Sequence, residues 1–214
     1  MNRPARIVSR ASAVTERTRM TSAWHESGHG LMAWLNGERV ALLSIRPTAV
    51  YGGVCQAAHR RIDVKLLDCR PVILQPARLR RSLETALFFS LAGPIAAEMC
   101  APRTGYLQQS ADEGRAEQVA RALARLHPST AERLRVAEAR TDAIQTDEDT
   151  AFIYADALAF DEAVQYLAWA RAATRRLLAE HADELAAVAT ALYARDVISG
   201  RQMVAAIRAT KGPH

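Results

Sequence analysis

Over most of this chain, apolar residues recur three and four positions apart, which is the periodicity of an amphipathic helix. Residues 23–35 have this pattern, and so does an unusually apolar segment that starts at Ala77 or Ser82 and ends at Cys100. A third such segment covers residues 111–126. The remainder, residues 129–210, is rich in Ala, Leu and Arg and predicts further helices, with breaks at 147–149 and 199–200.

Capping and breaking residues indicate where some of these helices begin and end. Thr21 or Ser22 is suited to cap the first helix, and the Asn-Gly pair at residues 36–37 is suited to end it. Ser110 is placed to cap the helix over residues 111–126. Pro94 lies inside the apolar segment before Cys100, where its missing N–H predicts a kink or a break.

Two short segments have the pattern of strands instead. Residues 39–47 and 50–57 alternate and carry β-branched residues around turn signals at Pro47 and Gly52-Gly53, so we expect a short hairpin or two sheet strands. Residues 60–76 contain two prolines and predict a connecting loop. Strands near the start with many helices after them predict a mostly α, α+β fold that has a small sheet near the first helix.

The first twenty residues differ from the rest of the chain. They are basic and contain no apolar core, so we expect residues 1–20 to form a flexible arm rather than a secretory signal. We expect residues 21–210 to form one domain. The longest apolar candidate, residues 86–97, is too short for a bilayer and is interrupted by Gly93-Pro94, which predicts no membrane span.

The net charge and the cysteine content limit which binding partners and which cellular compartment we expect. The formal net charge is +5, but the arginines are spread over many segments and only 6% of the residues are aromatic, so nucleic-acid binding is not expected. Cys55, Cys69 and Cys100 are odd in number and lack metal-ligand spacing. Such cysteines are typical of small buried residues in a reducing compartment, and we expect a cytoplasmic protein.

An H-E-x-x-H sequence, residues 25–29, lies in the first predicted helix. Positions four apart share one helix face, so the imidazoles of His25 and His29 can reach one metal ion while Glu26 projects beside it. Neutral imidazoles suit zinc, and a catalytic zinc site keeps one position open for water. The alternative is a polar helical turn in which both histidines merely hydrogen-bond to nearby groups.

The same spacing is typical of zinc peptidases. Zinc lowers the pKa of bound water and polarises the scissile carbonyl, while a carboxylate that is not a ligand takes the proton of the water and passes it to the leaving amine. Glu26 is the candidate for this general base.

The motif by itself lacks a third ligand. An H-E-x-x-H-x-x-G-x-x-H site is excluded, because Met32 and Leu35 stand at the required Gly and His positions. Asp112 is attractive because it lies near the start of a predicted helix, and Glu98 because a carboxylate in so apolar a helix needs a partner. The distant candidates are His59, Glu84, Glu98, Asp112, Glu113 and His127.

Three motifs, in this order along the chain, resemble the peptidase domain of the FtsH-type ATP-dependent zinc metalloproteases. Residues 25–29 are similar to that family's H-E-A-G-H. Residues 91–99 are similar to its L-G-G-R-A-A-E-E-L segment, except that Pro94 stands in place of Arg. Residues 110–121 are similar to S-N-D-L-x-x-A-T-x-x-A-R, and weaker likeness at 171–181 and 192–200 extends the resemblance over about residues 21–207.

This resemblance implies a zinc endopeptidase in which Asp112 is the third metal ligand beside His25 and His29, and Glu26 is the base. It implies that Glu98 lies close to the metal site and orients one of the histidine ligands. It also implies a strand near the cleft at residues 50–57, where a peptide could add to the sheet edge; an ordinary internal strand is an equal alternative. The family's six-fold rings suggest a homohexamer.

The family joins this domain to an ATPase module and to membrane-spanning helices, whereas this sequence has no G-x-x-x-x-G-K-[ST] phosphate loop. We therefore expect zinc-dependent hydrolysis of peptide bonds in unfolded or flexible polypeptides, not ATP-dependent by itself. One alternative is a non-catalytic or regulatory zinc-binding interaction protein. Another is a proteolytic subunit of a separate ATPase, with residues 1–20 as the docking element.

Overall fold

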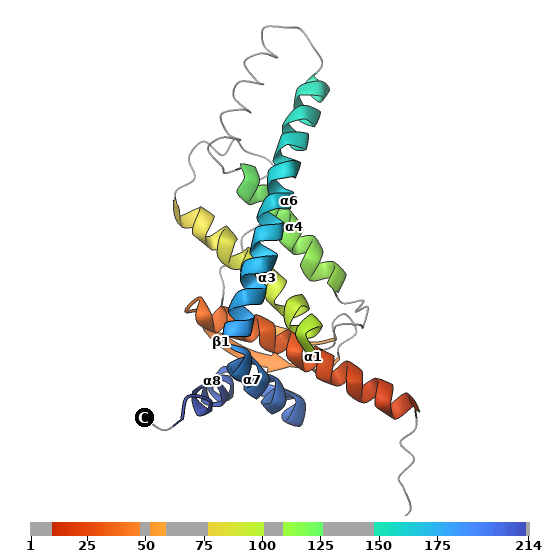
Figure 1. Cartoon of the computed structure of the whole chain (residues 1–214), viewed down its shortest axis with the longest axis vertical. Helices are drawn as coiled ribbons and strands as arrows, with labels where there is room; N and C mark the ends of the chain where they lie inside the picture. Colours follow the sequence, from red (N-terminus) through yellow and green to blue (C-terminus); the bar gives the residue numbers. More distant parts are fainter. Residues whose placement is uncertain (1–9, 48–51, 59–76, 101–108, 126–147, 213–214) are drawn as a thin grey trace, which may run out of the picture. The chain divides into compact units, whose positions relative to one another are not determined.

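The computed structural model describes residues 10–47, 52–58, 77–100, 109–125 and 148–212 (Figure 1). The predicted loop at 60–76 lies outside these residues. In chain order, the helices and strands are α1 (Arg10–Leu35), β1 (Val40–Ser44), β2 (Val54–Ala57), α3 (Ala77–Cys100), α4 (Gln109–Arg125), α6 (Glu148–Glu180), α7 (Ala182–Arg195), β3 (Val197–Ser199) and α8 (Gly200–Ala209).

The chain divides into two compact units. Unit 1 comprises Met1–Ala58, Ile95–Gly105 and Leu178–His214, and unit 2 comprises His59–Pro94 and Tyr106–Leu177. The boundary falls inside two continuous helices, α3 and α6. Most described residues are helical, and the sheet belongs to unit 1. The predicted mostly α, α+β fold with a small sheet is confirmed.

The sheet of unit 1 has three antiparallel strands in the order β2-β1-β3. On the central strand, Leu43 lies opposite Cys55 of β2 and opposite Ile198 of β3. The predicted hairpin over residues 39–47 and 50–57 is confirmed by β1 and β2. Among the strands that the structure describes, β2 lies at one edge of the sheet, and the addition of a peptide at that edge stays a prediction.

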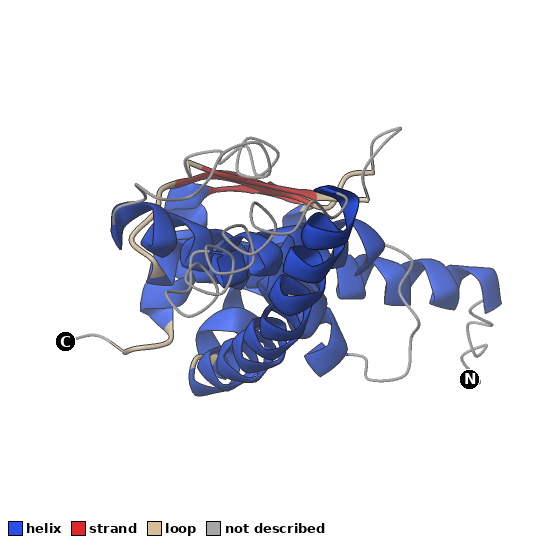
Figure 2. Ribbon diagram, turned by 90° about the horizontal axis from the view of Figure 1, so that it is seen from above, coloured by secondary structure: helices blue, strands red, loops and turns tan. Residues whose placement is uncertain are grey.

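Helix α1 lies along one face of this sheet (Figure 2). It also packs against α7. Leu31 and Met32 of α1 and Leu43 of β1 are fully buried, and each such side chain contributes roughly 1.5–3 kcal/mol. Gly30 allows the close approach, because a Cβ there would lie 3.0 Å from the side chains of both Leu43 and Met203. The helix that carries the H-E-x-x-H motif is therefore held tightly within its own unit.

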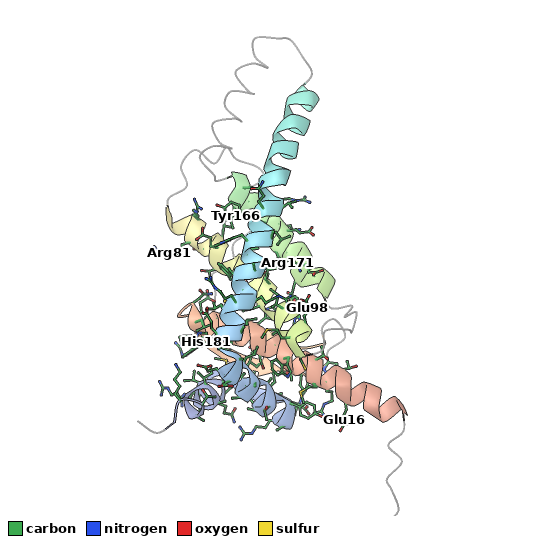
Figure 3. The ribbon with its side chains drawn as sticks, viewed as in Figure 1. Glu16, Arg81, Glu98, Tyr166, Arg171 and His181 are labelled. Atoms are coloured by element: carbon green, nitrogen blue, oxygen red, sulfur yellow. The ribbon has the colours of Figure 1, made fainter. Side chains whose placement is uncertain are left out.

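Unit 2 contains all of α4 and most of α3 and α6. Arg80 of α3 donates to the hydroxyl of Tyr166 on α6 at 2.7 Å, and Arg171 of α6 forms an ion pair of 2.8 Å with Glu113 of α4. Figure 3 labels Tyr166 and Arg171. These contacts tie α6 to both other helices. The buried side chains that α3 and α4 contribute to unit 2 include Leu83, Leu87, Leu91, Ala116, Val119, Ala120 and Leu123.

Helix α1 begins earlier than its capping residues predicted. It starts at Arg10, so the caps at Thr21 or Ser22 are wrong: both residues lie in the middle of the helix, where they are buried at 3% and 7% exposure. Packing has overridden their preference for a helix end. Arg19, in the segment predicted to be an arm, bonds Asp196 at 2.5 Å and the carbonyl of Tyr193 at 3.3 Å. Residues 1–9 lie outside the described part of the chain.

For two later helices, the predicted cap of α4 is wrong, and of the kink or break predicted at Pro94 in α3 the break is absent. Helix α4 begins at Gln109 and already includes Ser110, so this serine is not its cap. Helix α3 continues through Pro94 without a break. Proline inside a helix costs about 3 kcal/mol or more, and the complete burial of Leu91 and Ile95 on either side offsets that cost.

The third strand was not predicted, since residues 129–210 have a helical pattern nearly throughout. Val197 and Ile198 are β-branched, and Ile198 is fully buried against β1. The predicted break at residues 199–200 is confirmed: Ser199 caps α8 by accepting from the N–H of Gln202, whose side chain accepts from the N–H of Ser199. Of the helices predicted there, α6, α7 and α8 are present, and residues 126–147 lie outside the described chain.

Helix α3 matches the apolar segment that predicted it, and it extends beyond residues 86–97, the run considered for a membrane span. From Arg80 to Cys100 it is long and apolar enough, by length and composition, to cross a membrane, although 61% of its most apolar window is buried inside the structure. A buried core helix passes the same test. The expectation of no membrane span stays a prediction.

Candidate metal centre

Three side chains of the H-E-x-x-H motif, all on helix α1 of unit 1, are buried. His25 is 3% exposed, Glu26 5% and His29 5%. Because His25 and His29 are four positions apart, one turn of this helix presents both imidazoles on the same face. Burying three ionisable side chains on one turn is costly unless they bind something or one another.

The two imidazoles approach through their Nε2 atoms, which lie 3.1 Å apart. Two nitrogens bound at about 2.0–2.1 Å to one tetrahedral zinc ion would be separated by about 3.3 Å. The observed separation therefore fits a shared ion with little movement of either ring. The same distance suits a hydrogen bond in which one Nε2–H donates to the other Nε2, which holds the pair together without an ion.

The carboxylate of Glu26 lies against the backbone at the start of strand β2. A Cβ built on Gly53 would come within 2.6 Å of its Oε1, 2.9 Å of its Cγ and 3.0 Å of its Cδ. Glu26 thus projects from α1 toward the edge strand. A side chain that acts on an extended polypeptide bound along β2 would have to point from α1 toward this strand, as Glu26 does.

Cys55, on β2, also lies in the field of Glu26. Burial raises the pKa of the Cys55 thiol, and the negative charges of Glu26 and Glu38 raise it further. The pKa of Glu38 is itself raised by burial. A raised pKa keeps the metal-free thiol protonated at neutral pH.

Asp112 belongs to unit 2, where it lies in the first turn of α4 and is half-buried. The positive end of the helix dipole favours a carboxylate at this position. Its neighbour Glu113 is engaged by Arg171 of α6 at 2.8 Å. Asp112 remains the predicted third ligand.

Glu98 lies in the last turn of α3, within unit 1, and is half-buried (Figure 3). Its role beside the metal stays a prediction. Among the other distant candidates, Glu84 is occupied by an ion pair with Arg80 at 3.0 Å on the same helix. His59 and His127 lie outside the described residues.

The chain matches no protein-family model and no curated protein. The resemblance to FtsH-type peptidases accordingly rests on the motifs at residues 25–29, 91–99 and 110–121. A function for this chain therefore has to be inferred from the chemistry of the residues around His25 and His29.

Two residues at this site are not singled out by the sequence. In the sequence, Gly53 is only a turn signal and Cys55 only a small buried residue. The sequence does hold one signal for Gly53. It is the second of two glycines and lies directly before a strand, where glycine can mark the close approach of another group. Its proximity to Glu26 arises from contact between residues 27 positions apart and is not visible in local periodicity.

Proposed function

We propose that this chain is a zinc-dependent metalloendopeptidase that hydrolyses peptide bonds in unfolded or flexible polypeptides. The observation that carries the proposal is the pair of buried imidazoles of His25 and His29, 3.1 Å apart on one helical turn, with buried Glu26 beside them. A structural zinc site fills all four coordination positions and needs no such carboxylate. The presence of Glu26 beside the two histidines favours the catalytic alternative.

The ligand set of the proposal is His25, His29 and Asp112. It offers two imidazole nitrogens and one carboxylate oxygen, a set of donors that could hold a metal ion and that suits zinc. When bound, zinc would acidify water and polarise the scissile carbonyl. Asp112 is included because of the motif at residues 110–121. Glu98 is not a ligand in this proposal; it is proposed to orient one of the two histidines.

Glu26 supplies proton transfer in this mechanism. Its carboxylate accepts a proton from the attacking water as the new C–O bond forms, and then gives that proton to the amine nitrogen as the C–N bond breaks. Burial of Glu26 limits bulk water around the carboxylate. Such positioned proton transfer is worth roughly 10²–10⁴ in rate.

The edge strand β2 is the proposed docking element for substrate. It pairs with β1 on one side in the described sheet, which leaves its other backbone edge for an extended peptide. Backbone hydrogen bonding recognises chain conformation more than sequence, so unfolded segments are the preferred substrates. A cytoplasmic location, ring assembly and a separate ATPase partner stay predictions.

The decisive experiment compares wild type with Glu26→Gln, Asp112→Ala and Glu16→Gln. Glu16 is an exposed carboxylate on the same helix, and the same change there is a matched control (Figure 3). Each protein is stripped with chelator, reloaded with zinc, manganese or cobalt, and assayed on a fluorescently labelled unfolded protein. Metal content is measured on the same samples.

We expect wild type and Glu16→Gln to cleave, chelator to abolish cleavage and zinc to restore it. Glu26→Gln should retain zinc and lose roughly 10²- to 10⁴-fold in rate, whereas Asp112→Ala should lose zinc and activity together. Wild type that binds zinc, cleaves nothing and does not differ from Glu26→Gln would favour the non-catalytic zinc-binding protein. Activity that survives in Glu26→Gln would come from a contaminant or from a different base.

A further inference from the structure

We infer that Gly53 is a positioning residue for Glu26: its missing side chain leaves the space that the working carboxylate occupies. The inference rests on the proposed function, because it takes Glu26 to be the base. Its structural basis is the close approach of two residues from different elements, α1 and the segment before β2, both in unit 1.

The space is too small for any other residue. Real Cβ atoms essentially never approach another heavy atom closer than 3.0 Å, yet a Cβ on Gly53 would lie 2.6 Å from Oε1 and 2.9 Å from Cγ of Glu26. Even alanine would require the carboxylate to move. The contact is not with the backbone of α1 but with the last atoms of the Glu26 side chain.

Backbone conformation does not explain the glycine. Among the described glycines, positive φ angles occur at Gly37 and Gly212, and Gly53 is not one of them. A residue with a side chain could adopt the backbone angles of Gly53 without the strain of a left-handed conformation. The requirement for glycine at this position therefore comes from Glu26.

The expected consequence separates function from folding. Oε1 is at the end of a flexible side chain, so rotation of the Glu26 side chain can relieve the clash without moving α1 or β2. The fold should tolerate alanine at Gly53, but the carboxylate would leave the position from which it accepts a proton. Displacement of a reacting group by about 1 Å can lower a rate on the order of 100-fold.

The test has a kinetic part. Gly53→Ala should lower kcat on the order of 100-fold, while KM and zinc affinity change less than threefold. Glu26→Ala removes Cγ, Cδ and Oε1 and should be slow by itself, but adding Gly53→Ala in that background should cause no further loss. A wild-type kcat for Gly53→Ala, or a parallel loss of zinc, overturns the inference.

A second part needs no activity. Urea unfolding of wild type, Gly53→Ala, Glu26→Ala and the double variant forms a double-mutant cycle in stability. Gly53→Ala should lower the free energy of unfolding when residue 26 is glutamate and should not lower it when residue 26 is alanine. Gly114→Ala is the control: its Cβ would meet nothing within 4 Å, so its effect on stability should not depend on residue 26. Zero coupling between positions 53 and 26 overturns the inference even if the enzyme is active. If positions 53 and 26 are coupled in stability but the protein binds zinc and cleaves nothing, the proposed peptidase function is wrong. The steric fit of Gly53 to Glu26 would still hold.

Discussion

The imidazole rings of His25 and His29 meet edge to face, with ring planes at 78° and their Nε2 atoms 3.1 Å apart. This geometry places two lone-pair positions in one small volume. If both rings were protonated, two positive charges would share that buried volume, so at least one imidazole must be neutral for the pair to persist. Neutral imidazole is also the form that binds zinc.

Removing either imidazole should therefore abolish tight zinc binding. We expect His25→Ala and His29→Ala to lose zinc during chelator dialysis, while wild type recovers one equivalent on reloading. His181→Ala is the control, because His181 lies at the start of α7 and contacts Glu184 rather than the motif. Metal analysis and calorimetric titration measure the outcome. Equal zinc affinity in His29→Ala and wild type would contradict the shared-ion geometry.

Zinc should also stabilise the fold through the same two residues. At a free zinc concentration of 100 times Kd, linkage adds roughly 2.7 kcal/mol to the free energy of unfolding, provided that the unfolded chain does not bind. Thermal unfolding with and without zinc should show this gain in wild type and not in His25→Ala. A similar gain in both proteins would locate the zinc elsewhere.

Two adjacent carboxylates in α4 allow a matched test of the third ligand. Asp112→Asn should lower zinc affinity by more than the roughly 10- to 100-fold that changes outside the ligand set produce. Glu113→Gln alters a carboxylate that is engaged by Arg171 and should leave zinc affinity unchanged. Glu98→Gln should lower zinc affinity by roughly 10- to 100-fold. If Glu98→Gln loses zinc and Asp112→Asn keeps it, the ligand assignment is wrong.

The thiol of Cys55 reports on Glu26 through its pKa. Burial, then the charges of Glu26 and Glu38, raise this pKa, so at any given pH less thiolate is present and alkylation is slower. In metal-free protein at pH 8, iodoacetamide should label Cys55 far more slowly in the folded than in the urea-unfolded state. Glu26→Gln should lower the pKa and speed labelling, although burial keeps the rate below that of the unfolded chain. Mass spectrometry resolves the site, and an unchanged rate in Glu26→Gln would argue against their proximity.

Gly200 and Gly114 should respond oppositely to the same substitution. A Cβ on Gly200 would lie 1.8 Å from the carbonyl oxygen of Val40, so β1 and α8 would have to move apart. We expect Gly200→Ala to destabilise unit 1 by roughly 1–3 kcal/mol or more. Gly114 lies inside α4 with open space around it, and alanine there should stabilise the protein by roughly 0.5–1 kcal/mol. Urea unfolding measures both, and a tolerated Gly200→Ala would contradict the packing of α8 on the sheet.

The sequence by itself determined the local features of this protein. Periodicity of three and four predicts α1, α3, α4 and the C-terminal helices, because each pattern reflects which side of one helix is buried. Alternation with turn residues predicts β1 and β2 for the same reason. The spacing of His25 and His29 guarantees one shared face once the segment is helical. None of these features requires knowledge of distant residues.

Tertiary structure decided the features that depend on long-range contacts. Thr21 and Ser22 lie inside α1 rather than at its end because both are buried, and α3 runs through Pro94 because apolar burial outweighs the lost hydrogen bond. Strand β3 exists because Ile198 pairs with Leu43, some 155 positions away along the chain. The fit of Gly53 to Glu26 has the same origin. Local preferences are worth about 1 kcal/mol per residue, and packing terms of several kcal/mol override them wherever the chain folds back on itself.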